Sequence, residues 1–162
     1  MKTHVSHSLE ETQKIAAQWL VDISRERGGT ARGADQATVI GLSGHLGAGK
    51  TAFVKAVARE LGIAEEVTSP TFVLMKLYDI PESAGSAGDH SANNSWPWKR
   101  LVHIDAYRLE RTEELQALNW EQLVSDPHNL IMVEWPENVG LNENTEGQMS
   151  FRVEDGAIVI AF

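Results

Sequence analysis

One stretch of the sequence has the residue types and the spacing needed to hold phosphate groups. Residues 44–51 read Gly-His-Leu-Gly-Ala-Gly-Lys-Thr, which matches the pattern G-x-x-x-x-G-K-[ST]. Glycines let the backbone curl so that N–H groups point at phosphate oxygens, and a following helix adds the positive end of its dipole. Lys50 would bridge the β- and γ-phosphates, and Thr51 would offer its hydroxyl to magnesium. The predicted nucleotide-binding residues are Leu46, Gly47, Ala48, Gly49, Lys50, Thr51 and Ala52.

The surroundings of this loop support the same interpretation. An apolar run over 38–42 precedes it, and a helical spacing of apolar residues over 50–61 follows it. A glycine-rich turn that merely joined a strand to a helix would not explain why Lys50 and Thr51 follow the last glycine. We therefore predict a phosphate-binding loop, which makes the chain an ATP-binding protein that uses Mg²⁺.

A bound magnesium ion needs a carboxylate, and two acids stand where one is expected, at the end of an apolar strand. Glu134 ends the run 130–133 and is followed by Trp135 and Pro136, and Asp105 ends the run 101–104. Either acid could instead belong to an ordinary turn. The residues alone leave both open as metal ligands and as the group that positions the attacking water. We predict catalytic roles for Lys50, Asp105 and Glu134.

Other polar residues near these runs allow two interpretations each. The segment 67–72 places three hydroxyl groups around Pro70, which is typical of a nucleotide-sensing switch but also of a simple turn. Tyr107 and Arg108 could contact a phosphate or pair on the surface. His103 is more often a satisfied strand histidine than a catalyst.

The remaining pattern describes the elements that must position these residues. Ser8 and Glu11 have capping-box spacing at the start of a helix that continues to about 23, before the glycine-containing segment 25–36. Further helices are expected over 50–61 and from Thr112 to about 124. Strands are expected over 38–42, 72–77, 101–104, 129–133, 151–153 and 157–162. This order predicts an α/β, three-layer P-loop NTPase fold with a mixed, mostly parallel central sheet and a C-terminal hairpin.

Composition sets the remaining limits. The 162 residues are 42% hydrophobic and 23% charged, as expected for one globular domain over 1–162. The segment 81–98 is interpreted as a mobile surface loop, or as a short hairpin stabilised by Trp96 and Trp98. The chain has no cysteine, no apolar run near its start and no stretch resembling a membrane span, which indicates a cytoplasmic protein. A net charge of −9 indicates that nucleic acid would be reached through a partner.

Four motifs in order resemble those of the bacterial TsaE (YjeE) family. They are residues 47–51 (Gly-Ala-Gly-Lys-Thr), 69–72 (Ser-Pro-Thr-Phe), 103–109 (His-Ile-Asp-Ala-Tyr-Arg-Leu) and 133–137 (Val-Glu-Trp-Pro-Glu). The resemblance spans 44–137 and is more specific than the phosphate loop alone. It implies a small ATPase needed to make threonylcarbamoyl-adenosine in tRNA, working with the partner proteins TsaB and TsaD. ATP hydrolysis by this ATPase would reset or cycle the complex of TsaB and TsaD.

The resemblance also implies roles for single residues. Thr51 and Glu134 would be the magnesium ligands, and Asp105 would orient the attacking water. Residues 69–72 would form a switch segment that reads the γ-phosphate. The start of the first helix, near Glu11 and Thr12, would lie beside the adenine.

Two rival functions use the same loop. A small-molecule P-loop kinase needs an acceptor pocket and usually an arginine-bearing lid, but the chain after the second apolar strand offers only Arg108 and Arg111 together. A GTP-dependent switch would normally carry D-x-x-G and N-K-x-D, and neither pattern occurs in the sequence. The kinase remains the alternative to an ATPase that is slow without its partners.

Overall fold

The centre of the computed structural model, which describes residues 2–29, 35–68, 70, 73–84, 96–141 and 147–162, is one sheet. Its seven strands have the order β1-β7-β6-β2-β5-β4-β3. They are β1 (Thr3–Ser6), β2 (Thr38–Gly44), β3 (Met75–Asp79), β4 (Arg100–Asp105), β5 (Asn129–Glu134), β6 (Gly147–Glu154) and β7 (Ala157–Ala161). The neighbours β6, β2, β5 and β4 are parallel, whereas β3, β7 and β1 pair antiparallel towards the edges.

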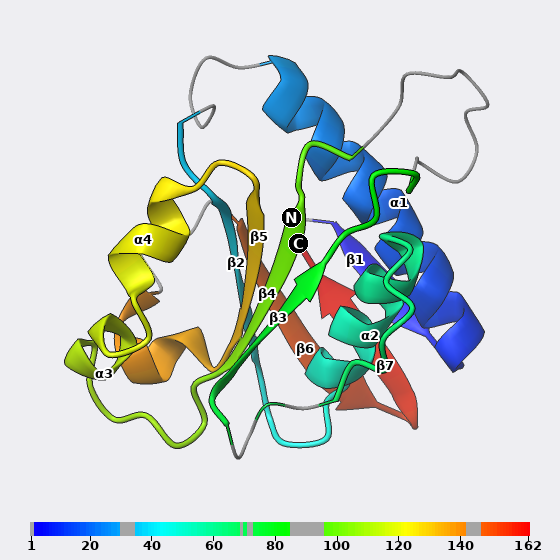
Figure 1. Ribbon diagram of the computed structural model, residues 1–162. Coiled ribbons are helices and arrows are strands. Elements are labelled where there is room, and N and C mark those ends of the chain that lie inside the picture. Colours follow the sequence, from blue (N-terminus) through cyan, green and yellow to red (C-terminus); the bar gives the residue numbers. More distant parts are fainter. Residues whose placement is uncertain (1, 30–34, 69, 71–72, 85–95, 142–146) are drawn as a thin grey trace.

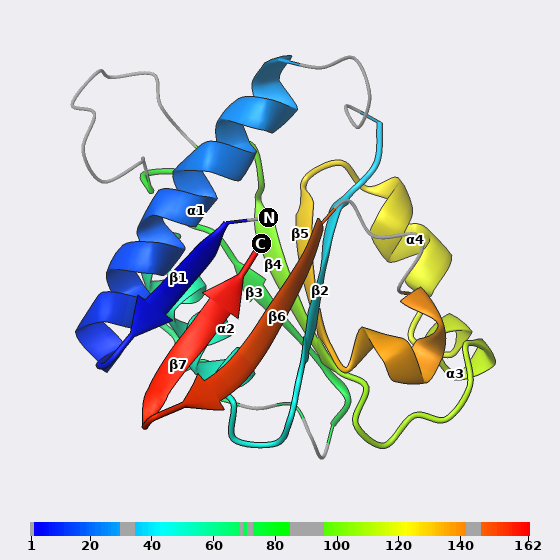
Figure 2. The same ribbon diagram turned by 180° about the vertical axis from the view of Figure 1, so that it is seen from behind.

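Helices cover the sheet on both faces, as Figures 1 and 2 show. The helices are α1 (Leu9–Gly29), α2 (Lys50–Glu60), α3 (Glu113–Gln116), α4 (Trp120–Ser125) and the 3-10 helix η1 (Pro136–Val139). One apolar core joins α1 and α2 to the sheet through Trp19 and Phe53, and a second core includes Val102, Ile131 and Leu115 on the other face. The predicted three-layer α/β fold with a mixed, mostly parallel sheet is confirmed.

Burial explains why the central segments become strands. All six residues of β5 are buried, and so are the first five residues of β2. A strand covered on both faces needs a continuous apolar run rather than alternation, which is the pattern that the sequence shows in both segments. At the start of α1, the Ser8 Oγ accepts a hydrogen bond from the Glu11 N–H at 3.1 Å, as the capping-box spacing predicts.

The helix predicted from Thr112 to about 124 is wrong, because two short helices, α3 and α4, occupy this segment. Between them, Asn119 has a φ of 57°, a left-handed conformation that no α-helix continues through. A residue with positive φ also lies within the segment 72–77, where a strand was expected. Leu74 has a φ of 64°, and β3 begins only at Met75.

Two further bounds differ from the prediction, and one strand was not predicted. The first helix continues to Gly29 instead of stopping near 23. The first arm of the C-terminal hairpin begins at Gly147 rather than at 151. The edge strand β1 was not predicted, because its four residues include only one large apolar side chain; pairing with β7 over Thr3–Ser6 forms it instead.

The segments 25–36 and 81–98 lie partly outside the described residues, namely at 30–34 and 85–95. The end of the segment 81–98 is not a surface loop, because Trp96 and Trp98 are buried with exposed fractions of 8% and 2%. The Trp98 Nε1 donates a hydrogen bond to the Thr38 Oγ1 at 2.9 Å. Among the helices of the described residues, none has the length and hydrophobicity needed to cross a membrane.

Arg27 joins three segments at the end of the sheet where β2 and β5 begin. Its guanidinium donates to Thr38 Oγ1, to the Gln36 carbonyl at 2.6 Å and to the Pro127 carbonyl at 2.5 Å. We expect Arg27→Ala to lower the free energy of unfolding by about 1.5–3 kcal/mol, since hydrogen bonds from a charged donor are lost. Urea denaturation measures this, and Arg25→Ala, which removes an exposed arginine from the same helix, is the control. Equal midpoints for the two variants would contradict the expectation.

Candidate functional site

The loop between β2 and α2 has the conformation that its glycines were expected to allow. Gly44 has a φ of 144°, and a Cβ at this position would lie 2.3 Å from the Phe151 carbonyl oxygen. Gly49 has a φ of 99°, and a Cβ there would lie 2.7 Å from the Ile158 Cδ1. Gly44 therefore requires glycine for backbone conformation and for space, and Gly49 requires it for backbone conformation. The curled loop leads directly into the amino end of α2 at Lys50, as a phosphate-binding loop must.

Asp105 and Glu134 lie beside this loop because of the register of the parallel strands. Asp105 ends β4 and pairs with Glu134, which ends β5, and Glu134 in turn pairs with Leu42 of β2. The carboxyl ends of three neighbouring strands thus bring both acids to the edge where the loop begins. The two side chains are almost fully buried, with exposed fractions of 5% and 3%.

Glu134 accepts hydrogen bonds from both sides of the site. Its Oε1 lies 2.7 Å from the Thr51 Oγ1, which donates to it, and 2.9 Å from the His103 Nε2. A hydroxyl and a carboxylate that meet at hydrogen-bond distance supply two oxygen ligands of the kind that Mg²⁺ prefers. The pair Thr51 and Glu134 therefore fits a magnesium ion whose other ligands would be phosphate and water. Asp105, by contrast, uses Oδ1 to accept the Tyr107 N–H at 3.0 Å.

Lys50 lies over the loop with an exposed fraction of 4%. Its Nζ donates to the carbonyls of Gly44 at 2.6 Å and His45 at 2.9 Å, and it lies 4.0 Å from the centre of the Trp135 ring. Burial lowers the pKa of Lys50, and the negative charges of Glu134, Glu137 and Asp105 oppose that shift. Burial thus raises the free energy of the charged form of Lys50. A phosphate group would form stronger hydrogen bonds with the ammonium group than the two carbonyls do.

These residues surround one pocket of about 290 Å³. All seven residues predicted to bind nucleotide line it, from Leu46 to Ala52, together with Asp105, Glu134, Tyr107 and Trp135. The structure therefore brings together every residue of the predicted catalytic, nucleotide and metal sets. Among the described residues that line the pocket, Lys50 is the only one with a positive charge.

Other residues singled out in the sequence either are not among the described lining residues of this pocket or lie outside the described residues. Glu11 and Thr12 are not among its described lining residues, so their contact with adenine stays a prediction. Of the predicted switch segment, Ser69, Thr71 and Phe72 lie outside the described residues. Arg108 is also absent from the described lining residues of the pocket.

Trp135 lines the pocket but was not predicted as a functional residue, whereas Tyr107 was predicted either to contact a phosphate or to pair on the surface. Trp135 directly follows Glu134, and its ring lies 5.1 Å from the ring of Tyr107. Trp135 has a φ of 60°, unusual for a bulky side chain, and this turn places the indole beside the Lys50 ammonium group. The one signal in the sequence for a role of Trp135 at the site was its position directly after Glu134, the acid that ends the strand. Its positive φ cannot be predicted from residue types.

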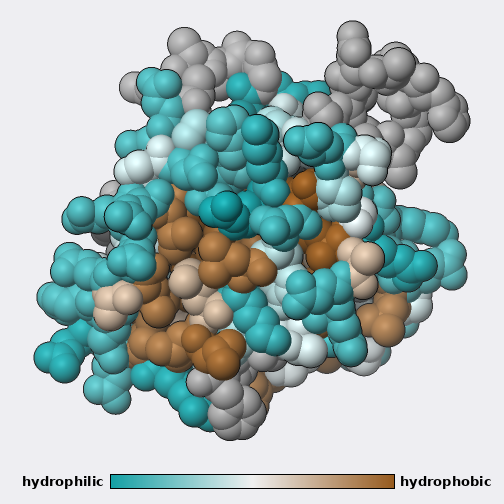
Figure 3. All heavy atoms as spheres, viewed as in Figure 1, coloured by the Kyte–Doolittle hydropathy of each residue, from teal (hydrophilic) through white to brown (hydrophobic). Residues whose placement is uncertain are grey.

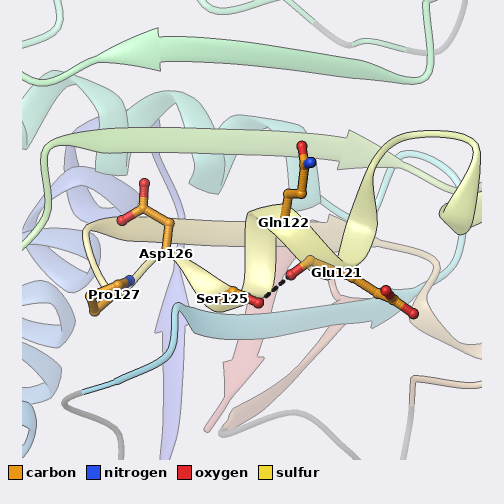
Figure 4. Close-up of a pocket in the computed structure, with 5 residues that line it drawn as sticks. All are labelled: Glu121, Gln122, Ser125, Asp126 and Pro127. Carbon is orange, nitrogen blue, oxygen red and sulfur yellow. Dashed lines mark hydrogen bonds between the residues drawn. The ribbon is translucent and has the colours of Figure 1, made fainter.

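A wider hollow of about 570 Å³ lies at the other end of the sheet and is lined by Glu121, Gln122, Ser125, Asp126 and Pro127. Figure 4 shows its residues on α4 and the turn that follows, with the Ser125 Oγ donating to the Glu121 carbonyl at 2.6 Å. The full length of β5 separates this turn from Glu134. The hollow is lined by one short segment and holds no residue of the predicted site, so its greater volume does not make it the functional site.

The sequence matches the family described as threonylcarbamoyl adenosine biosynthesis protein TsaE over residues 6–157. Proteins described as tRNA threonylcarbamoyladenosine biosynthesis protein TsaE are similar to the chain. The one from Streptomyces coelicolor is 37% identical over 70% of this chain and 66% of its own length. Those from Treponema pallidum and Borreliella burgdorferi are 36% and 32% identical, over 65% and 59% of this chain and 64% and 58% of their own lengths. The matched part of the chain thus spans less than two thirds of each relative.

The fold also has a solved counterpart. The crystal structure of Bacillus subtilis YdiB superimposes with a TM-score of 0.59, covers 98% of this chain and 82% of its own, and is 24% identical in sequence. At that identity the likeness concerns the fold alone. The family match covers nearly the whole chain, from the strand before the first helix to the last hairpin. The chain belongs to the TsaE family, whose members are described as threonylcarbamoyl adenosine biosynthesis proteins.

Proposed function

We propose that the chain is a magnesium-dependent ATPase required for the threonylcarbamoyl-adenosine modification of tRNA, and that its ATP hydrolysis cycles a TsaB–TsaD complex. One observation carries the proposal. The phosphate-binding loop, the Thr51 hydroxyl and the Glu134 carboxylate converge in one pocket, with Thr51 and Glu134 in direct contact at 2.7 Å. Family membership supports the role in tRNA modification.

Each residue has a part in the proposed reaction. The backbone N–H groups of the loop would bind phosphate oxygens, and Lys50 would exchange the carbonyls of Gly44 and His45 for the β- and γ-phosphates. Asp105 would orient the attacking water at the end of β4. Thr51 and Glu134 would hold the magnesium ion, which neutralises charge that develops on the phosphate oxygens. The chemistry is then positioning and electrostatic stabilisation, with no covalent intermediate on the protein.

The exposed surface of the protein is consistent with partner proteins rather than with direct binding of tRNA. Leu46 lines the pocket and is 79% exposed, and Tyr107, which also lines it, is 49% exposed. Figure 3 shows hydrophobic surface gathered across the middle of the face where β3 lies, and Leu77 of β3 is 45% exposed. A net charge of −9 disfavours contact with a phosphate backbone. We therefore propose that tRNA is reached through TsaB and TsaD.

The test measures ATP hydrolysis with magnesium by the purified chain, alone and with TsaB, TsaD and substrate tRNA. We expect slow hydrolysis by the chain alone, because the described lining of the pocket offers only one cation, and a clear increase in rate with the partners. Lys50→Ala should remove the activity in both settings. Hydrolysis indifferent to the partners would contradict the tRNA-modification role, and phosphorylation of a small acceptor molecule would favour a kinase instead.

A further inference from the structure

His103 is a buried polar residue whose side chain the proposed reaction does not yet use. It lies in the middle of β4 with an exposed fraction of 0%, two residues before Asp105. We infer that His103 is a positioning residue, which holds the carboxylate of Glu134 in the orientation that binds the metal ion. The inference rests on the proposed function, because it assigns a role to His103 at the metal site proposed there.

The contact between the two side chains is direct. The His103 Nε2 lies 2.9 Å from the Glu134 Oε1, and the same oxygen accepts the Thr51 hydroxyl at 2.7 Å. The three side chains come from β4, β5 and α2, so this one oxygen joins the sheet to the helix that follows the phosphate-binding loop. Thr51 can keep this hydrogen bond while its oxygen lone pairs turn to a metal ion. His103 is then the partner of Glu134 that holds the carboxylate from the side of the sheet.

The direction of the hydrogen bond follows from the chemistry of its partners. An ionised carboxylate only accepts, so the Nε2 of His103 must carry the proton and donate it. Within the described part of the chain, the His103 Nδ1 is buried and has no hydrogen-bond partner. His103 therefore holds the carboxylate through its Nε2, which donates the hydrogen bond to Glu134.

A fixed carboxylate matters because the affinity of a metal site depends on how its ligands are oriented. Groups that hydrogen-bond to the ligands typically change metal affinity by roughly 10- to 100-fold when they are removed. Without the imidazole, Glu134 would keep only the Thr51 hydroxyl as a hydrogen-bond donor among the described residues. The carboxylate would then be free to rotate away from the orientation that the metal requires.

The first experiment measures Mn²⁺ affinity by electron paramagnetic resonance in the presence of a non-hydrolysable ATP analogue. His103→Leu should weaken Mn²⁺ binding by roughly 10- to 100-fold, with the affinity for the analogue in EDTA unchanged. His103→Gln can place an amide N–H near the position of the imidazole Nε2 and should restore most of the affinity. The matched control is Met132→Leu, which alters the buried β5 residue that pairs with His103 in the register and should bind Mn²⁺ like the wild type.

A second experiment needs no variant and no metal. Nitrogen NMR of the imidazole rings in the wild-type protein should show a proton on the Nε2 of His103, which donates to Glu134. A ring without a proton on Nε2 would overturn the inference, and so would equal Mn²⁺ affinity in wild type and His103→Leu. A wild-type protein that binds no Mn²⁺ with the analogue would contradict the proposed function itself and the inference with it. The two failures are therefore distinguishable.

Discussion

Replacing Lys50 with methionine should lower the rate of ATP hydrolysis by about 10²- to 10³-fold, because a preorganised donor to the transferring phosphate is lost. Methionine keeps much of the length of the side chain but carries no charge. Lys50 is the only cation among the described residues that line the pocket, so no neighbour can take its place. Nucleotide affinity should fall as well, which calorimetric titration with an ATP analogue measures.

Unfolding is the competing explanation for such a loss, and the environment of Lys50 argues against it. Burial lowers the pKa of Lys50, so the charged form costs the folded protein stability at neutral pH. Between the lowered pKa and the ordinary one, the unfolded chain binds a proton that the folded chain does not. The stability of the wild type relative to Lys50→Met should therefore rise with pH across that window. Lys55→Met, which changes an exposed lysine of the same helix, should keep full activity, and a Lys50→Met protein as active as this control would contradict the assignment.

Glu134→Gln should have the second-largest effect. The amide has nearly the same shape and can still accept a hydrogen bond from Thr51 or His103, but it removes the negative charge that a metal ion requires. We expect the magnesium concentration for half-maximal hydrolysis to rise by at least about tenfold and the maximal rate to fall by on the order of a hundredfold. Hydrolysis assays over a magnesium titration measure both quantities.

The control for charge alone is Glu137→Gln. Glu137 is an exposed acid near the same site, since its Oε2 accepts the Ser43 hydroxyl at 3.1 Å and its charge acts on the pKa of Lys50. It does not line the pocket among the described residues, so its replacement should leave the magnesium requirement almost unchanged. A magnesium requirement that shifts equally in both variants would show that general electrostatics, rather than a metal ligand at Glu134, governs the response.

Much of the site could be predicted from sequence because its main part is local. The phosphate-binding loop is one continuous segment, and its glycines, Lys50 and Thr51 act through the backbone turn that joins β2 to α2. Asp105 and Glu134 were predicted for a related reason, since each ends an apolar run. Parallel pairing of such runs brings their carboxyl ends to one edge of the sheet.

The contacts that depend on tertiary packing could not be predicted. The approach of His103 to Glu134 requires the register between β4 and β5, and the indole of Trp135 reaches Lys50 only through a positive φ. The break at Asn119 is of the same kind, because the apolar spacing of a helix continues across it in the sequence. Local patterns specify which element a residue joins, whereas partners distant along the chain decide where its side chain lies.

Binding of Mg²⁺ and ATP at the loop before α2 can be measured with a backbone NMR titration of the protein with an ATP analogue and magnesium. We predict that the largest chemical-shift changes fall on the amides of residues 46–52 and on Glu134. The hollow on α4, lined by Glu121 and Asp126, should remain unchanged. Changes concentrated on that hollow, or none at the loop with the analogue in excess, would contradict the account.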